Sequence, residues 1–227
     1  MKRLFILSLV ILSLALAAVT TAQAQGTDAT NAPVLRQNEH TLGKPAAKIT
    51  FMVFDDTQCE FCKELHNVLK ILQKKYPNDL KIAYRNFPIS SIHEFSYKEA
   101  KALECVNVIG GNDAFLNLLD QLYANTDYNN PDYLPRPETA LYNRPRHMRW
   151  LMRHSRNIGI LRTKLSKCVS QNTTKAKVDS DIEEGVRAGI MGTPTTFVYT
   201  GNHFQLRIEG AQPQSVFETI ITTLLAQ

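Results

Sequence analysis

Two cysteines, Cys59 and Cys62, stand three residues apart where a strand-like run gives way to a helix-like one. The run from Ile49 to Phe54 is almost entirely apolar, whereas the segment from Phe61 to Lys75 has apolar residues at helical spacing. A cysteine at the start of a helix lies among backbone N–H groups that lack helical partners, and their partial positive charge favours the thiolate. Cys62, one turn further along, is placed to close a disulfide with Cys59. The spacing therefore indicates thiol–disulfide exchange.

A Cys-x-x-Cys pair can also be half of a metal site. Structural zinc normally takes a second such pair or two histidines, and Cys105 and Cys168 each stand alone in the sequence. His66, four residues after Cys62, could complete a soft three-ligand site for copper(I) together with Cys59. A copper(I)-binding protein of the metal-resistance kind is therefore the alternative from a different class.

The N-terminus has the composition of a secretory signal peptide. Two basic residues precede an apolar stretch from Leu4 to Val19, and a small-x-small cleavage sequence follows at residues 22–24. The stretch is shorter than the roughly 20 residues that cross a bilayer. We therefore expect cleavage after residue 24, a mature chain that begins at Gln25, and a periplasmic or secreted protein whose cysteines meet oxidising conditions.

The mature chain is long enough to form one domain with a sizeable core. Loss of the two basic residues of the signal peptide lowers the formal charge of +5 by two, which leaves too little charge to indicate a nucleic-acid partner. Residues 25–42 are small, polar and without periodicity. We expect them to be a flexible leader before a single domain over residues 43–227.

The order of elements predicts an α/β domain. Strand, helix and strand are followed by a helical stretch, a hairpin and a last helix, at residues 49–55, 61–75, 80–87, about 90–188, 195–209 and from 214. A helical crossover between the first two strands implies that they are parallel. Within the helical stretch, the pair Gly110-Gly111 separates two helical patterns.

Four short motifs accompany this order of elements: Asp56 to Lys63, Arg85 to Pro88, Ala100 to Cys105, and Gly192 to Phe197. Together they resemble the DsbA-like branch of the thioredoxin fold, over about residues 42–227. The resemblance implies a thioredoxin fold with an inserted helical subdomain. It also implies a protein thiol–disulfide oxidoreductase that requires no bound cofactor.

The resemblance also assigns two further pairs of residues. In this family the bond before the proline that matches Pro194 is cis and faces the cysteines, so the backbone of Thr193 is expected to pair with an extended substrate strand. Some members carry a second disulfide that braces the helical region. Cys105 and Cys168 match its positions, and free buried cysteines are the alternative.

The function expected from these features is the oxidation of unfolded client proteins that have free thiols. Cys59 is expected to be the nucleophile and Cys62 the resolving cysteine. The resemblance implies reoxidation by a membrane partner of the DsbB type. Related isomerases oligomerise through an N-terminal domain, for which residues 25–42 are too few, so we expect a monomer.

Two departures from the best-known oxidases leave an alternative within the same chemistry. Glu60 and Phe61 stand where those proteins have proline and histidine, and a carboxylate beside Cys59 should disfavour its thiolate. Threonine before the cis-proline accompanies isomerase or reductase activity in several relatives, so Thr193 keeps an isomerase or reductase of the same fold as the alternative function.

Two other features of the sequence are interpreted without a functional role. The stretch from Asp127 to Arg156 is rich in proline, tyrosine and arginine, and we interpret it as a solvated loop followed by a basic helix face. The histidines other than His66, among them His40 and His93, have no evident constellation of partners in the sequence. We interpret them as surface or capping residues.

Overall fold

Strand β2 (Ile49–Asp55) is buried at every position because both of its faces are covered. Its odd-numbered residues, such as Phe51, belong to a core formed with helices α1 (Glu60–Lys75) and α6 (Gln214–Leu225). Its even-numbered residues, such as Phe54, belong to a second core on the opposite face. A strand buried on both faces is expected to be a continuous apolar run, as this one is.

The computed structural model describes residues 31–125 and 140–227, with side chains in the second range from residue 149 onward. The signal peptide, the expected mature start at Gln25 and residues 126–139 of the proline-rich stretch lie outside these ranges. Within the described ranges, no helix is both long enough and apolar enough to cross a membrane.

Five strands form one sheet in the order β1-β3-β2-β4-β5. The other four strands are β1 (His40–Leu42), β3 (Leu80–Asn86), β4 (Thr195–Thr200) and β5 (His203–Glu209). Strands β2 and β3 are parallel, and the other neighbouring pairs are antiparallel. The predicted β-α-β unit and C-terminal hairpin are both confirmed.

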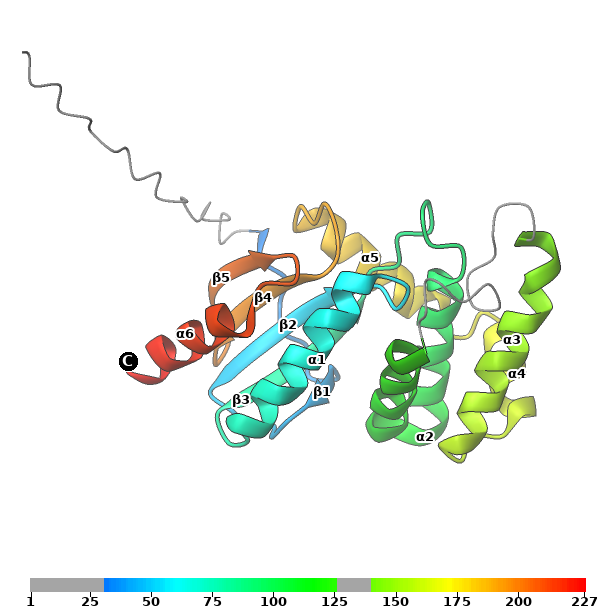
Figure 1. Cartoon of the computed structure of the whole chain (residues 1–227), viewed down its shortest axis with the longest axis horizontal. Coiled ribbons are helices and arrows are strands. Elements are labelled where there is room, and N and C mark those ends of the chain that lie inside the picture. Colours follow the sequence, from blue (N-terminus) through cyan, green and yellow to red (C-terminus); the bar gives the residue numbers. More distant parts are fainter. Residues whose placement is uncertain (1–30, 126–139) are drawn as a thin grey trace, which may run out of the picture.

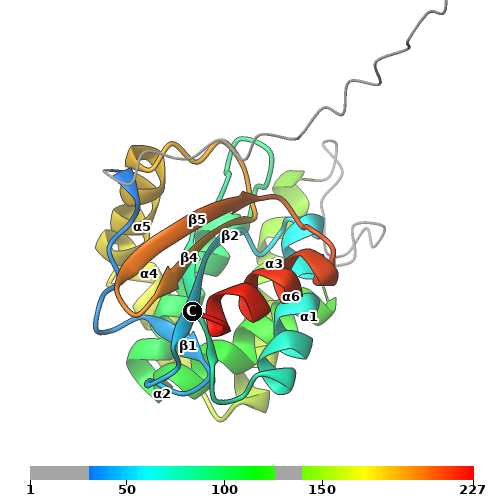
Figure 2. The same cartoon turned by 90° about the vertical axis from the view of Figure 1, so that its left-hand side faces the viewer.

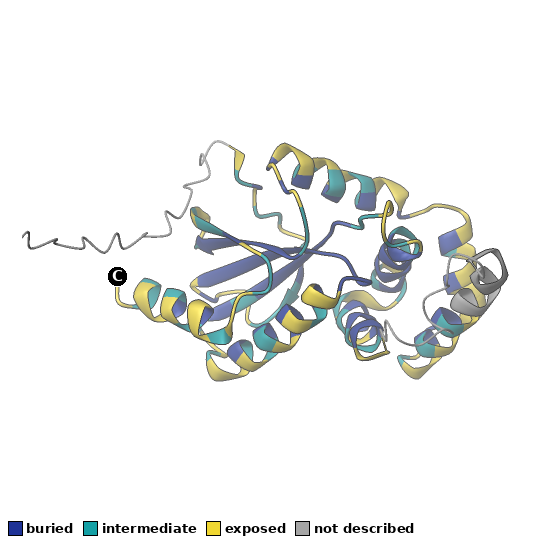
Figure 3. Ribbon diagram, turned by 45° about the horizontal axis from the view of Figure 1, so that its top comes forward, coloured by how far each residue is buried: buried dark blue, intermediate teal, exposed yellow. Residues whose placement is uncertain are grey.

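Helices cover both faces of the sheet. Helices α1 and α6 lie over one face, and α5 (Lys175–Arg187) lies over the other (Figures 1 and 2). Beside the sheet, α2 (Ser96–Asn125), α3 (Ala140–Asn157) and α4 (Arg162–Ser170) form a separate helical part. Figure 3 shows the strands as a buried layer between helices whose outer sides are exposed. This is the α/β thioredoxin fold with an inserted helical subdomain that the sequence predicts.

Helix α2 is interrupted where the sequence places its glycine pair. Gly111 has φ 79° and ψ −174°, a conformation that glycine adopts at little cost because it has no Cβ. The helical subdomain also contains a disulfide, which joins Cys105 of α2 to Cys168 of α4 with an S–S distance of 1.99 Å. The bond ties the part of α2 before Gly111 to α4, and its Cys105 end is fully buried.

The expectation of a flexible leader as far as residue 42 is wrong for the part that the structure describes. Residues 40–42 form β1 at the edge of the sheet, paired with β3. Before this strand, Glu39 forms an ion pair with Arg85, whose side chain is fully buried. The Arg85 guanidinium also pairs with Glu184 of α5 at 2.7 Å. These partners are distant in the sequence, so the composition of the segment could not reveal them.

His40 is likewise not a surface histidine. Its ring is buried, its Nε2 lies 2.9 Å from Oε1 of the buried Glu104, and it stacks on Phe115 at 3.9 Å. These contacts attach β1 to helix α2.

Removal of the Cys105–Cys168 disulfide should destabilise the fold without changing the other two cysteines. The bond spans 63 residues of sequence, and closing a loop of that length contributes about 4 kcal/mol on the chain-entropy model. We expect the C105A/C168A variant to melt about 10 °C lower in a calorimetric scan. A folded variant that loses most of its thiol-exchange activity would contradict a purely structural role for this bond.

Candidate functional site

The two cysteines of the Cys-x-x-Cys motif lie at the start of α1, directly after the loop that follows β2. Cys59 is the N-cap residue, with an extended backbone, and no side chain caps the helix. The first-turn N–H groups of α1 are therefore directed toward the Cys59 region. Cys59 is 7% exposed and Cys62 is 2% exposed. Cys59 is thus the more accessible of two largely buried cysteines.

The Gly-Thr-Pro turn before β4 meets the cysteines because the start of β4 pairs with the end of β2, where Thr195 lies opposite Phe54. The Thr193–Pro194 peptide bond is cis, as the resemblance implies. Sγ of Cys59 lies 3.4 Å from the carbonyl oxygen of Thr193, 134 residues away in sequence. The turn is fixed by a hydrogen bond of 2.8 Å from the Thr195 hydroxyl to the Gly192 carbonyl. The structure therefore brings together the four residues predicted for the site.

The two sulfurs have opposite electrostatic environments. A hydrogen bond from the Cys62 thiol lowers the pKa of Cys59 to about 6. Burial opposes this shift, and a hydrogen bond from the Cys62 backbone N–H adds to it. Burial, together with the charges of Asp55 and Cys59, raises the pKa of Cys62 well above its ordinary value. At neutral pH the reduced pair therefore consists of a thiolate at Cys59 and a thiol at Cys62.

Asp55, the last residue of β2, is a buried carboxyl group that sequence reasoning missed. Burial raises the pKa of Asp55 to about 8, although a hydrogen bond of 2.8 Å from the Tyr123 hydroxyl lowers it. The charge of Asp55 in turn raises the pKa of Cys62. A carboxyl that titrates near neutral pH beside a buried thiol is suited to exchange a proton with that thiol.

Asp56 holds the loop that carries the cysteines. Its Oδ1 accepts a hydrogen bond of 2.8 Å from the Gln58 N–H, and its Oδ2 accepts one of 2.7 Å from the Ile89 N–H. Oδ2 also lies 2.8 Å from Nδ1 of His93. The sequence signal available for Asp56 was its position just before a helix start, where aspartate commonly bonds free N–H groups.

The expectation that a carboxylate disfavours the Cys59 thiolate names the wrong residue: the carboxylate is Asp56, not Glu60. Glu60 is exposed to solvent, which screens its charge. The carboxylate among the main influences on the pKa of Cys59 is the buried Asp56, and its effect is smaller than that of the Cys62 hydrogen bond.

His66, the possible third ligand for copper(I), is engaged on both ring nitrogens. Nε2 lies 2.7 Å from Oδ1 of Asp120, and Nδ1 lies 3.2 Å from the Tyr84 hydroxyl. Metal binding through His66 would have to break one of these bonds. Among the side chains that the structure describes, no group of three or more His, Cys, Asp or Glu is arranged to hold a metal ion.

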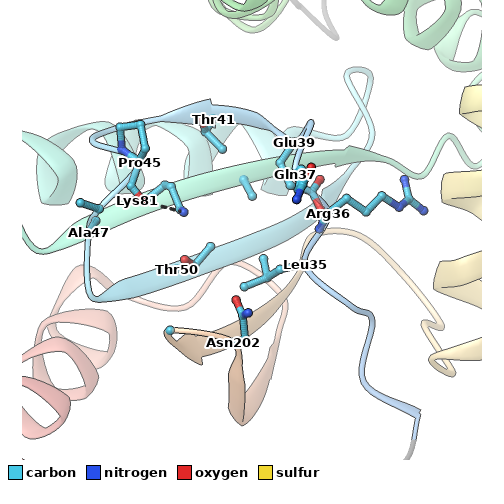
Figure 4. A pocket seen from close by; sticks show the side chains of 13 residues that line it. Leu35, Arg36, Gln37, Glu39, Thr41, Pro45, Ala47, Thr50, Lys81 and Asn202 are labelled. Atoms are coloured by element: carbon cyan, nitrogen blue, oxygen red, sulfur yellow. Dashed lines mark hydrogen bonds between the residues drawn. The ribbon is translucent and has the colours of Figure 1, made fainter.

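A pocket of about 600 Å³ lies away from the cysteines, between the N-terminal segment and the sheet (Figure 4). Leu35, Arg36 and Glu39 line it from the segment, and Thr50 and Lys81 line it from β2 and β3. It contains neither a cysteine nor a histidine, so its lining offers no group for thiol chemistry.

The comparisons with known proteins agree with this geometry. Residues 36–221 match the family model described as Thioredoxin, which shows that the chain belongs to this family. The fold is similar to that of DsbA2 from Pseudomonas aeruginosa, with a TM-score of 0.63 and 22% identity over 84% of this chain and 96% of that one. It is also similar to oxidised BdbD from Bacillus subtilis, with a TM-score of 0.70 and 19% identity over 86% and 97% of the two chains.

Similar sequences also occur within longer proteins. The Na(+)/H(+) antiporter NhaA 1 of Mycolicibacterium gilvum is 24% identical over 95 residues, which are 42% of this chain and 15% of the antiporter. The chain thus spans only a small part of that relative. The chain is therefore a member of the thioredoxin family with a DsbA-like fold, and it carries its cysteine pair at the start of α1.

Replacement of Asp55 by asparagine should change how stability depends on pH. The pKa of Asp55 is raised by folding, so its stabilising contribution is complete below about pH 4 and is lost as the pH rises toward about 8. In this pH window the Asp55 carboxyl makes the free energy of unfolding fall by up to about 1.4 kcal/mol per pH unit, and we expect D55N to remove this fall. Urea unfolding at pH 5 and pH 8 would measure the free energy of unfolding of both proteins. An equal change between the two pH values in D55N and in the unsubstituted protein would contradict the raised pKa of Asp55.

Proposed function

We propose that this chain acts as an exported oxidase that introduces disulfides into client proteins. The observation that carries the proposal is the contrast between the two sulfurs, with the pKa of Cys59 lowered to about 6 and that of Cys62 raised. Stabilising the Cys59 thiolate stabilises the reduced pair, and a stable reduced form makes the disulfide a stronger oxidant.

The reaction begins with the oxidised Cys59–Cys62 pair. A client thiolate attacks Sγ of Cys59, the Cys59–Cys62 bond breaks, and a bond between the client sulfur and Cys59 forms. Cys62 leaves as a thiolate and takes a proton. Asp55, whose pKa is about 8, is protonated at neutral pH and is available to donate it.

The second half of the reaction completes the transfer of two electrons. Another thiolate of the client attacks the client sulfur in the mixed disulfide, and Cys59 leaves as a thiolate. The client gains a disulfide, and both protein cysteines are reduced. Because Cys59 has a low pKa, it is a good leaving group in this step.

The cis-proline turn supplies the backbone on which a client can bind. The Thr193–Pro194 backbone lies beside Cys59, so an extended client strand that pairs with it would bring its own cysteine to the reactive sulfur. Two large apolar side chains flank this position: Phe61 is 61% exposed and Met191 is 90% exposed. An unfolded client offers apolar side chains that could cover them.

We also propose where the protein acts and what reoxidises it. Residues 1–24 would direct export, and the mature protein would act as a monomer in the periplasm or outside the cell. Reoxidation of the Cys59–Cys62 dithiol would need an electron acceptor, for which a membrane partner of the DsbB type is proposed from the family resemblance.

Cysteine variants test the proposed roles directly. C62S should accumulate mixed disulfides with client proteins that already contain a disulfide. The Cys59 thiolate attacks the client disulfide and displaces one client thiolate, and Cys62 is no longer present to break the new bond. C59S should accumulate none. Non-reducing electrophoresis followed by mass spectrometry would identify the linked cysteine. Trapping by C59S would contradict the assignment of Cys59 as nucleophile.

The redox potential separates the oxidase from a reductase or isomerase of the same fold. Equilibration of the pair against glutathione should give a value nearer the about −120 mV of strong oxidants than the about −270 mV of reductants. A value at the reducing end would favour the alternative function.

A further inference from the structure

A histidine from a different part of the chain lies at the base of the cysteine loop. His93 belongs to the segment between β3 and α2, and its Nδ1 lies 2.8 Å from Oδ2 of Asp56. The backbone N–H of Cys59 donates to the Asp56 carbonyl at 3.0 Å. One residue, Asp56, therefore joins the histidine to the reactive cysteine.

The contacts that hold His93 in this position are specific. The N–H of Ile89, in the same segment, donates to the Asp56 oxygen that faces His93. The carbonyl of His93 accepts a hydrogen bond of 2.9 Å from the Ser96 hydroxyl at the start of α2. The His93 side chain is 17% exposed and the Asp56 side chain is fully buried, so the pair is only weakly screened by solvent.

The surroundings of the cysteines are otherwise rich in carboxyl groups. Asp56 is buried, and the fully buried Glu99 of α2 accepts a hydrogen bond from the Thr57 hydroxyl. The buried Asp55 adds a further negative charge as the pH rises through its pKa of about 8. Each negative charge in such a place opposes the formation of a thiolate. The residue pair between the cysteines adds no cation, because it consists of Glu60 and Phe61.

We propose that His93, held by Asp56, is a positioning residue whose positive charge offsets these carboxylates and stabilises the Cys59 thiolate. The inference deepens the proposed function, because it takes Cys59 as the reacting thiol. A histidine supplied by the segment before α2 would thereby adjust the oxidising strength of a pair that has no cation between its cysteines.

The electrostatic coupling supports this geometry. The hydrogen bond to Asp56 raises the pKa of His93, burial opposes this, and the charges of Asp56, Cys59 and Glu99 add to it. Coupling between two titrating groups is reciprocal, so protonated His93 must favour the Cys59 thiolate by the same free energy. Because His93 is charged below its raised pKa, this support is present in mildly acid solution and is lost as the pH rises through that pKa.

Two substitutions separate the charge of His93 from its hydrogen bond. H93Q can still donate to Asp56 but carries no charge, whereas H93K carries a charge that does not titrate near neutral pH. The matched control is H203Q, which removes an exposed histidine of β5. The measurements are the absorbance of the thiolate at 240 nm against pH and the equilibrium of the cysteine pair with glutathione.

We expect H93Q to raise the Cys59 pKa by about half to one unit. The equilibrium with glutathione should shift three- to tenfold toward the disulfide, which corresponds to about 15–30 mV. H93K should keep the Cys59 pKa near that of the unsubstituted protein, and H203Q should match the unsubstituted protein in both measurements.

Two results would overturn the inference. If H93Q leaves both quantities unchanged, His93 does not act on Cys59. If H93Q and H93K shift them equally, the effect comes from loop geometry rather than charge. A failure of the proposed function looks different, because it would show as a potential of the cysteine pair at the reducing end of the range in the unsubstituted protein, whichever way H93Q shifts the Cys59 pKa.

Discussion

The carboxylate of Asp56 fixes the loop on which the rest of the site depends. It accepts hydrogen bonds from the Gln58 and Ile89 backbones and faces His93, so it joins the loop after β2 to the segment before α2. The backbone carbonyl of Asp56 accepts a hydrogen bond from the Cys59 N–H, and the Asp56 N–H lies 3.5 Å from Sγ of Cys62. The start of α1 is therefore held against both the sheet and the helical subdomain.

This constraint explains why two cysteines of one short motif differ so strongly. Cys59 lies at the helix start, where it receives hydrogen bonds from Cys62 and faces the Thr193 carbonyl. Cys62 lies one turn deeper, where burial and the charge of Asp55 keep its proton in place. A stable thiolate at one sulfur and a protonated thiol at the other are the properties that a thiol–disulfide oxidoreductase needs.

Features encoded by neighbouring residues could be predicted from the sequence. The apolar run of β2, the helical spacing of α1 and the glycine break in α2 depend on local patterns, and the structure confirms them. Features that depend on distant partners could not be predicted in this way. Strand β1 is three residues long and is held by contacts to β3 and α2, and the pairing of His93 with Asp56 crosses 37 residues. Local patterns alone therefore indicate an unstructured segment for β1 and a surface position for His93.

The most direct test of the account is the pH dependence of alkylation of the reduced protein. Iodoacetamide reacts with thiolates, and mass spectrometry of the digested protein distinguishes the Cys59 site from the Cys62 site. The account predicts that Cys59 is alkylated with a half-maximal rate near pH 6 and that Cys62 stays unmodified at neutral pH. A Cys59 rate that rises only around pH 8 to 9, as for an ordinary thiol, or earlier modification of Cys62, would contradict it.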